Sequence, residues 1–520
     1  MGPAEICKFL KTKLYDGRKE TVKPIFISAA LTGLFCYFYQ MVWGYGNADS
    51  IAEGVYFYYG ANWATSNGRW FIRILNGFIG RNVVIPTVAV IGDVLLIALA
   101  AVLIAEMLKI KNKASLVLMT AMLVASPVVI EQLQYLYIGL SYGAAFLLSA
   151  LSVYLILLKP AGRFLKILLP VLSTLCITVM LGIYQSYIGA AAMLILLVAI
   201  VKLMDGERIR DIFLTCLKYL GSGVTGGILD LVIFKTIMKL QGLEAAERVG
   251  TFSLQTITGQ LSDSLKNCYF NLFSYFNDAM MMRRYAYLVF FVTGLVLLAA
   301  GLVKLLRSGK IASFITILVL LIVLPVFINI TGVIFPDNGI TNIMRYQDVL
   351  YIPLILALLE RLTVKKAPAE WAAALSLFFL VSTYTISANA TALCNRISYD
   401  AITHQALLML ADAYDVEEYE DGTAIIFAGG ITDSVPRTYT GIYEYAIGTG
   451  SPVFYNNTFS MERSRYNFAY NYLGVNLQHI SESFYEELVA SEEFQSMPVW
   501  PEEGSVRYMD GCIVIKTREY

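Results

Sequence analysis

The stretch "VVIPTVAVIGDVLLIALAAVLIAEMLKIKNK" (residues 83–113) decides the fold class of this chain. Residues 83–108 are almost wholly apolar, and a helix of about 20 apolar residues crosses the ~30 Å hydrocarbon core of a membrane. Lysines follow at once in "KIKNK" (109–113), as is typical of a connection on the cytoplasmic side. The stretch therefore predicts a membrane-spanning helix that ends at the cytoplasm.

The same pattern recurs along the chain. Of its 520 residues, 57% are hydrophobic and 15% are charged, against roughly 25% charged in a soluble domain. We therefore expect a polytopic α-helical membrane protein with residues 24–389 as its membrane domain. About eleven transmembrane helices are predicted, near 24–44, 83–108, 114–132, 136–158, 167–184, 186–201, 218–240, 286–303, 311–334, 347–360 and 369–389.

Basic residues give this topology a direction. An excess of Lys and Arg marks cytoplasmic connections. All the basic stretches fall on one side of the predicted topology: 1–23, 109–113, 159–166, 202–211, 304–310 and 361–366. We expect the N-terminal arm (1–23) to be cytoplasmic and the first apolar run to be a retained anchor. An odd number of spans places the C-terminus outside the cell.

Residues 390–520 differ from the rest because no apolar run there reaches membrane length. "GTAIIFAGG" (422–430) predicts a buried strand, and "SFYEELVASEEFQ" (483–495) predicts an amphipathic helix. "GSVRYMDGCIVIKT" (504–517) predicts a hairpin with its turn at Asp510-Gly511. We expect a small extracytoplasmic α/β domain. Cys394 and Cys512 would both lie outside, where either a disulfide or two free thiols is consistent with the sequence.

Several function classes are disfavoured by composition and motifs. A formal net charge of zero argues against a nucleic-acid partner. The two histidines and seven scattered cysteines show no zinc-type spacing. P-loop, Rossmann, GxSxG and HExxH motifs are absent from the sequence, and the cytoplasmic connections are too short for a nucleotide-binding domain. An activated substrate would have to come from outside the chain, and a lipid-linked donor fits that requirement.

The first outer loop (45–82) carries an unusual set of charges beside the membrane. Asp49 and Glu53 are four residues apart, as are Arg69 and Arg73, so two short helices would present an acidic face and a basic face. An acid can deprotonate an attacking hydroxyl, and an arginine can bind a phosphate. Alternatively, the four residues form salt bridges with one another within an aromatic belt.

Two further motifs lie at predicted outer ends of spans. "SPVVIEQLQYLY" (126–137) places Glu131 where a carboxylate is costly unless it is paired, hydrated or at the water interface. "GIYQSYIG" (182–189) places Tyr184 and Gln185 in a turn that suits a sugar face, although tight outer turns often have this composition.

Two later segments carry charges as well. "IFPDNGITNIMRYQD" (334–348) supplies Asp337 and Arg345, the latter a second candidate for phosphate or an ordinary interface arginine. Asp230 lies within a glycine-rich predicted span and is expected to make a structural polar contact.

These motifs together are similar to a known family. "NADSIAEG…NGRWFIRIL", "IEQLQY" and "YQS" resemble the Gtr-type glucosyl transferase family of bacteria, which serves in O-antigen modification and related surface glycosylation. The ending "MPVWPEEGSVRYMDGCIVIKT" (497–517) resembles the tail of its Gram-positive members. The resemblance implies a GT-C-like fold in the plasma membrane and a catalytic acid in the first outer loop.

The resemblance also implies the substrates. The donor would be a polyprenyl-phosphate sugar, undecaprenyl-phosphate glucose, and the acceptor a growing surface glycan. The family's first-loop acid falls on Asp49, and its GR(W/P) element falls on Gly68, Arg69 and Trp70. Position 48 is alanine, so a second acid must be Glu53 or lie elsewhere, and a divalent metal is not indicated.

The expected mechanism is a single inverting displacement in which Asp49 removes the acceptor proton. Glu53 would orient the acceptor or pair with Arg73. The donor phosphate would be held by Arg69, Arg73 or Arg345, and substrate contacts are expected from Trp70, Glu131, Tyr184, Gln185 and Asp337. A surface-polysaccharide polymerase or ligase is the main alternative. A lipid-linked glycan transporter would be expected to show internal repeats and broken helices, and a scaffold would have no use for the charged first loop.

Overall fold

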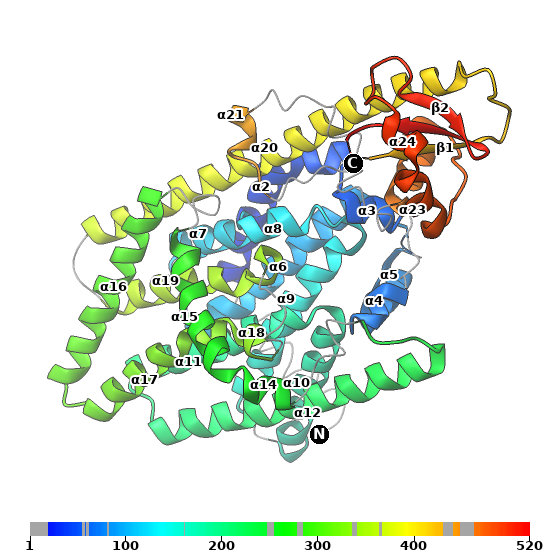
Figure 1. Ribbon diagram of the computed structural model, residues 1–520. Coiled ribbons are helices and arrows are strands. Elements are labelled where there is room, and N and C mark those ends of the chain that lie inside the picture. Colours follow the sequence, from blue (N-terminus) through cyan, green and yellow to red (C-terminus); the bar gives the residue numbers. More distant parts are fainter. Residues whose placement is uncertain are drawn as a thin grey trace.

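In the computed structural model of this protein, the described residues are 19–54, 58, 62–80, 83–160, 162–246, 254–277, 284–334, 341–362, 367–429, 440–447 and 462–519. These residues form a helical bundle with a small domain at the C-terminal end of the chain (Figure 1).

Ten helical segments among the described residues are long and apolar enough to cross a membrane, each with at least 18 residues. The predicted mostly helical structure is therefore confirmed, and the number of long apolar helices indicates a membrane protein. The segments are formed by α2 (Lys19–Trp43), α6 (Pro86–Leu108), α7 (Lys113–Val124) with α8 (Pro127–Gln132), η1 (Leu136–Ile138) with α9 (Gly139–Leu157), α10 (Arg163–Ile183), η2 (Gln185–Tyr187) with α11 (Ile188–Met204), α12 (Ile209–Gln241), α16 (Arg284–Arg307), α17 (Ile311–Ile328) and α20 (Ala367–Tyr414).

The predicted count of eleven is not confirmed, because segment 347–360 forms η4 (Tyr346–Leu350) followed by α19 (Tyr351–Arg361). An 11-residue helix is about 16 Å long, roughly half of the hydrocarbon thickness. Residues 346–350 and 352–358 are all buried inside the bundle. A segment enclosed by other helices can contain non-helical backbone, because protein groups satisfy its polar atoms.

The packing of the bundle follows from the distribution of apolar residues. Every residue from 189 to 201 of α11 is buried, as expected of a helix that is hydrophobic all round. In contrast, α12 exposes Phe213, Leu217, Leu220 and Val224. Apolar side chains exposed on a helix of membrane length form a surface suited to lipid tails.

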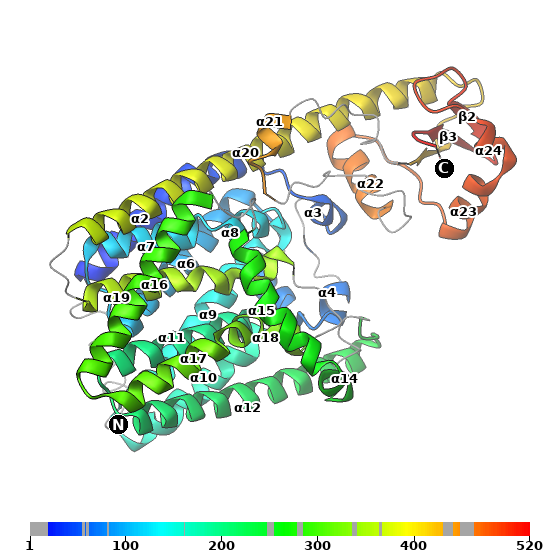
Figure 2. The same ribbon diagram turned by 60° about the vertical axis from the view of Figure 1, so that its left-hand side comes forward.

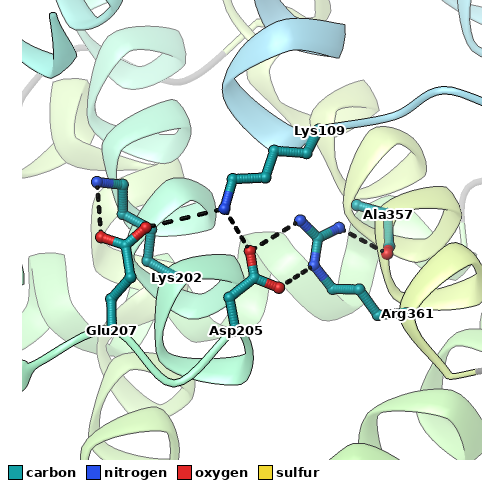
Figure 3. A network of polar contacts seen from close by, with 6 residues as sticks. All are labelled: Lys109, Lys202, Asp205, Glu207, Ala357 and Arg361. Atoms are coloured by element: carbon teal, nitrogen blue, oxygen red, sulfur yellow. Dashed lines mark hydrogen bonds and ion pairs between the residues drawn. The ribbon is translucent and has the colours of Figure 1, made fainter.

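An ion-pair network joins three connections at one end of the bundle, here called the ion-pair end (Figure 3). Asp205, which follows α11, accepts hydrogen bonds from Lys109 Nζ at 2.7 Å and from Arg361 Nε at 2.7 Å. Lys109 also lies 3.8 Å from Glu207, which pairs with Lys202 at 3.1 Å. Three of the predicted basic connections, 109–113, 202–211 and 361–366, therefore contribute residues to one end of the bundle.

Replacing Asp205 with Asn is expected to lower the free energy of unfolding at pH 7 by about 1 kcal/mol, because the network is partly exposed to solvent. Partial burial works to raise the pKa of Asp205, but hydrogen bonds from Arg361 and Lys109 outweigh it and hold the pKa below the ordinary 3.8. A lowered folded-state pKa stabilises the protein above the ordinary value, and the stabilisation is lost as pH falls through the folded-state pKa.

Thermal unfolding of the detergent-solubilised protein measures this effect. The difference between Asp205→Asn and the unchanged protein should be present at pH 7 and should shrink as the pH falls below about 4. Asp263→Asn, in an exposed i,i+3 pair with Lys266, is the matched control and should change little. An equal loss of thermal stability in Asp205→Asn and Asp263→Asn at pH 7 would contradict a stabilising role of the network.

Helix α20 connects the bundle to the C-terminal domain. Its 48 residues give a length of about 72 Å, so it extends well beyond the bundle (Figures 1 and 2). The domain boundary expected at residue 390 falls inside this helix, which continues without a break to Tyr414. The buried residues of α20 up to Ala388 pack in the core of the bundle, whereas those from Tyr399 onward pack with the C-terminal sheet.

The C-terminal domain contains a three-stranded sheet of order β1-β3-β2. Strand β1 (Ala424–Ala428) pairs in parallel with β3 (Cys512–Lys516), which pairs in antiparallel with β2 (Val506–Met509). Asp510 and Gly511 have φ angles of 49° and 82°, as a tight hairpin turn requires. The predicted strand and hairpin are confirmed, and the predicted helix is present as α23 (Glu482–Ala490) and α24 (Glu492–Ser496). Cys394 and Cys512 are both free thiols.

Candidate functional site

The first long loop lies at the opposite end of the bundle, here called the loop end, and its described residues form three short helices. These are α3 (Ala48–Ala52), α4 (Asn62–Ser66) and α5 (Trp70–Gly80). Asn47 caps α3 through its Oδ1 atom, which accepts a hydrogen bond from the Ser50 amide at 3.1 Å. Asp49 lies in the first turn of α3, where a carboxylate is favoured by the helix dipole. Arg69 immediately precedes α5, and Arg73 lies within it.

Helix α3 is anchored to the "IEQLQY" segment. The Asn47 amide and the Ser50 hydroxyl both donate to the carbonyl of Gln134, at 3.0 and 2.7 Å. The Leu136 amide donates in return to the Ser50 hydroxyl at 3.0 Å. Ser50 is buried. Two motifs that are about 80 residues apart in the chain therefore form one polar contact at the loop end.

The "NGRW" turn is anchored to the "YQS" turn in the same way. Gln185 donates from Nε2 to the Asn67 carbonyl at 2.9 Å. Gly68 has a φ of +77°, and a β-carbon on it would lie 2.5 Å from that Nε2 atom. A glycine is favoured at this position because L-residues are strained at positive φ, and a side chain here would also displace the Gln185 amide from its hydrogen bond.

Gly68→Ala is therefore expected to destabilise the protein by about 2 kcal/mol, from left-handed strain together with the loss of the Gln185 hydrogen bond. Gly221→Ala is the matched control, because Gly221 lies in α12 with no atom near its missing β-carbon. Alanine there is expected to be neutral or slightly stabilising. Thermal unfolding of both variants tests this, and equal stability would show that the turn tolerates a side chain.

Arg69 is the central cation of the loop end. Its guanidinium carbon lies 4.7 Å from the ring centre of Tyr184 and 5.5 Å from that of Trp63. Its Nε atom is fully enclosed and has no hydrogen-bond partner among the described residues. Burial alone would lower the pKa of Arg69, but the facing tyrosines, Tyr184 foremost, raise its pKa overall, so the guanidinium remains charged.

Tyrosine rings surround this cation. Tyr58 packs against Tyr137 with ring centres 5.0 Å apart, and Tyr142 packs edge-on against Tyr184 at 5.3 Å. The hydroxyls of Tyr58 and Tyr142 are enclosed and lack hydrogen-bond partners within the described parts of the chain. Buried polar groups without partners are uncommon, and several around one cation indicate a site that binds a polar ligand.

Two carboxylates share this region with Arg69. Glu131 has a fully enclosed Oε2 atom without a hydrogen-bond partner in the described ranges, whereas Asp49 is exposed. Burial raises the pKa of Tyr135 most, Asp49 and Glu131 raise it further, and Arg69 lowers it. The three charged groups therefore all lie close enough to Tyr135 to act on its pKa.

Glu53 and Arg73 lie near Tyr58, as Arg69 does. Burial raises the pKa of Tyr58, Glu53 raises it further, and Arg69 and Arg73 lower it. Arg73 is exposed, and Glu53 is partly buried at the C-terminal end of α3. The fold thus brings together both charge pairs that the spacing of the first loop singled out.

Trp70 has a different position from Arg69. Its indole Nε1 donates to Asp230 Oδ1 on α12 at 2.7 Å, and its ring packs so closely on Gly182 that a β-carbon there would clash. The expected structural polar contact of Asp230 is confirmed. Trp70 fastens α5 to α10 and α12 beside the site.

Arg345 is buried and engaged at the loop end. Its Nε donates to Asp348 at 2.8 Å, and its Nη2 donates to the Asn271 carbonyl at 2.7 Å. The preceding turn is close to the "IEQLQY" segment, because Gln132 Nε2 donates to the Ile343 carbonyl at 2.9 Å. Asp337, the other candidate of this late loop, lies outside the described residues.

Asp93 and the clustering of the other tyrosines around Tyr184 were not predicted from the sequence. Asp93 lies inside the bundle on α6, and its Oδ1 accepts a hydrogen bond from the Gly143 amide at 2.6 Å. A single carboxylate inside a long apolar run was the available signal. Within the described ranges, no three His, Cys, Asp or Glu side chains gather in the manner of metal ligands.

Comparison with known protein families matches residues 38–358, more than half of the chain, to the family described as glucosyl transferase GtrII. The matched range includes α3, α4, α5, "IEQLQY", the "YQS" turn and Arg345. Neither the curated proteins nor the solved structures include a match to this chain.

Proposed function

Since this chain belongs to the glucosyl transferase GtrII family and is a glycosyltransferase, we propose that it transfers a hexose, glucose, from undecaprenyl phosphate to a surface glycan. Transfer would take place on the outer face of a bacterial plasma membrane, at the loop end of a GT-C-like bundle. A sugar donor and an acceptor are implied by the family; the lipid carrier is the proposal.

The observation that carries this proposal is the environment of Arg69. A guanidinium with an enclosed, unpartnered Nε and no ion-paired carboxylate among the described residues is costly without an anion. Arginine binds phosphate with short, charge-assisted hydrogen bonds. The phosphate of a membrane-embedded lipid would reach this site from the hydrocarbon, whereas a water-soluble nucleotide sugar would not.

The proposed reaction is a single displacement at the anomeric carbon. Asp49 takes the proton from an acceptor hydroxyl, and the hydroxyl oxygen forms a bond to the anomeric carbon. The bond from that carbon to the phosphate oxygen breaks, and the polyprenyl phosphate leaves with the electron pair. Arg69 stabilises the charge that develops on the phosphate. The anomeric configuration is inverted because the reaction has one displacement.

The neighbouring carboxylates take supporting roles in this proposal. Glu131, whose Oε2 has no partner in the described parts of the chain, accepts a hydrogen bond from a sugar hydroxyl. Glu53 orients the acceptor or pairs with Arg73. Tyr184 and Gln185 line the sugar site beside Arg69.

Arg73 and Arg345 are the remaining phosphate candidates. Arg73 is exposed on α5 and suits the first encounter with an anionic headgroup. Arg345 already bonds to Asp348 and Asn271, so it is the less favoured of the buried arginines. Asp337 remains a proposed substrate contact on sequence grounds, and Trp70 is proposed to support the sugar site through α5.

We further propose that the ion-pair end is cytoplasmic and that the C-terminal domain is outside. Arg345 bonds to residue 271 at the loop end, whereas Arg361 bonds to Asp205 at the ion-pair end. The segment between them passes from one end to the other in spite of its short helix. These contacts support eleven passages through the membrane, with the two termini on opposite sides.

A reconstituted transfer assay tests the proposed donor. The purified protein in liposomes should transfer sugar from polyprenyl-phosphate glucose and not from UDP-glucose. Polyprenyl-phosphate mannose should be used poorly. Transfer from UDP-glucose without added lipid would contradict the proposal, and transfer of a whole oligosaccharide from a polyprenyl diphosphate would favour the polymerase or ligase alternative.

A further inference from the structure

Helix α3 is contacted from outside the bundle by the C-terminal part of the chain. Asn467, on α22 (Glu462–Phe468), donates from Nδ2 to the carbonyls of Ile51 and Ala52 at 2.8 and 3.1 Å. Tyr399, on the extension of α20, donates its hydroxyl to the Gly46 carbonyl at 2.8 Å. The last two residues of α3 and the residue before its N-cap are thus hydrogen-bonded to C-terminal residues.

Apolar packing accompanies these hydrogen bonds. Ile51 of α3 is 1% exposed and belongs to a buried cluster whose other members all lie between residues 399 and 515. Tyr45, just before α3, packs on Tyr399 with ring centres 4.3 Å apart. Figure 2 shows α3 between the bundle and α22. One side of α3 therefore belongs to the core of the C-terminal domain.

The "IEQLQY" segment that anchors α3 is bound from the same direction. Gln134 Nε2 donates to the Ile447 carbonyl at 2.8 Å, and the Ile447 amide donates to Thr391 Oγ1 at 2.8 Å. Asn395 Nδ2 lies 3.4 Å from Gln134 Oε1. Gln134 is buried. Its backbone carbonyl accepts a hydrogen bond from α3, and its side chain donates one to the C-terminal part of the chain.

A helix of five residues has no stability of its own in water, because helix nucleation is unfavourable. Its position must come from its contacts, and the hydrogen bonds that it and the preceding Gly46 receive from Asn467 and Tyr399 come from residues beyond 358, outside the family match. Asp49 would therefore lose its position relative to Arg69 and Glu131 if these contacts were released.

We propose that the C-terminal part of the chain, through Asn467 and Tyr399, positions α3 and thereby sets the rate of transfer, an inference that rests on the proposed function of Asp49. Asn467 and Tyr399 are positioning residues and do not touch the substrates. The C-terminal domain is thus part of the working enzyme and not a separate appendage.

The test compares Asn467→Ala and Tyr399→Phe with Asn471→Ala in the full-length protein in liposomes. Asn471, one turn from Asn467, donates its side-chain hydrogen bond to the Asn467 carbonyl and not to α3, so it is a matched control. Asn467→Ala should lower kcat about tenfold with the KM for polyprenyl-phosphate glucose unchanged, because small misplacements of a catalytic group are costly. Tyr399→Phe should lower kcat about threefold, since it loses one hydrogen bond and keeps its ring. Asn471→Ala should leave kcat unchanged.

Hydrogen–deuterium exchange supplies the readout that is independent of activity. Amides of residues 45–54 should exchange faster in Asn467→Ala and Tyr399→Phe than in Asn471→Ala, with exchange in α9 and α11 unaltered. Faster exchange together with unchanged kcat overturns the proposal, as does unchanged exchange. Full activity of Asp49→Asn would contradict the proposed function of Asp49 but not the positioning of α3. The positioning is decided separately, by the amide exchange and the kcat of Asn467→Ala.

Discussion

Asp49→Asn is expected to lower the rate of sugar transfer by about 10²–10⁴-fold, the range that general-base catalysis contributes. Asparagine has nearly the same shape but cannot accept the proton of the acceptor hydroxyl. Asp49 is exposed, so the substitution should leave the fold intact, at a cost of at most about 1 kcal/mol from the interaction with the α3 dipole. Initial rates with polyprenyl-phosphate glucose measure the loss of transfer. Thermal unfolding of the same preparation measures the change in stability.

Glu53→Gln and Glu131→Gln are the matched controls, since each replaces a neighbouring carboxylate by its amide. Both should retain measurable transfer with a raised KM, because these residues are proposed to bind and orient substrates. Loss of activity in Glu131→Gln together with normal activity in Asp49→Asn would identify Glu131 as the base and refute the assignment of Asp49.

Arg69→Ala should lower kcat/KM by about 10²–10³-fold, the effect typical of removing one group that stabilises transition-state charge. Arg69→Lys should recover only part of this loss, because a lysine keeps the charge but lacks the planar fork that binds two phosphate oxygens. Folding should survive both substitutions, since removing a buried cation that lacks an ion-pair partner among the described residues relieves a desolvation cost.

Arg73→Ala is the matched control for Arg69, because it removes an exposed arginine one helical turn away. It should change kcat/KM less than about tenfold, and the change should fade at high salt, since exposed charges are screened. Similar losses in the Arg69 and Arg73 variants would contradict a buried phosphate site at Arg69.

The sequence predicted the elements that depend on local pattern. Apolar runs such as 83–108 identify spanning helices because the membrane requires continuous hydrophobicity, and the Asp510-Gly511 turn identifies its hairpin through residues that tolerate positive φ. The first loop, "IEQLQY" and the "YQS" turn were each singled out, but not their mutual contacts. Such contacts join residues far apart in the chain, and spacing carries no information on them.

The remaining features depend on tertiary surroundings. Segment 347–360 is as apolar as a span, but other helices enclose it. Within this enclosure its helix is only 11 residues long. Tertiary packing also encloses the hydroxyls of Tyr58 and Tyr142. It likewise brings Asn467 within hydrogen-bond distance of α3. No periodicity in the sequence marks Asn467, because its role lies in two hydrogen bonds to backbone carbonyls.

An experimental structure with polyprenyl-phosphate glucose bound tests the central claim most directly. The account predicts that the phosphate lies against the Arg69 guanidinium at the loop end, with the anomeric carbon of the sugar facing Asp49. A donor bound at the opposite end, near Asp205 and Arg361, would contradict it.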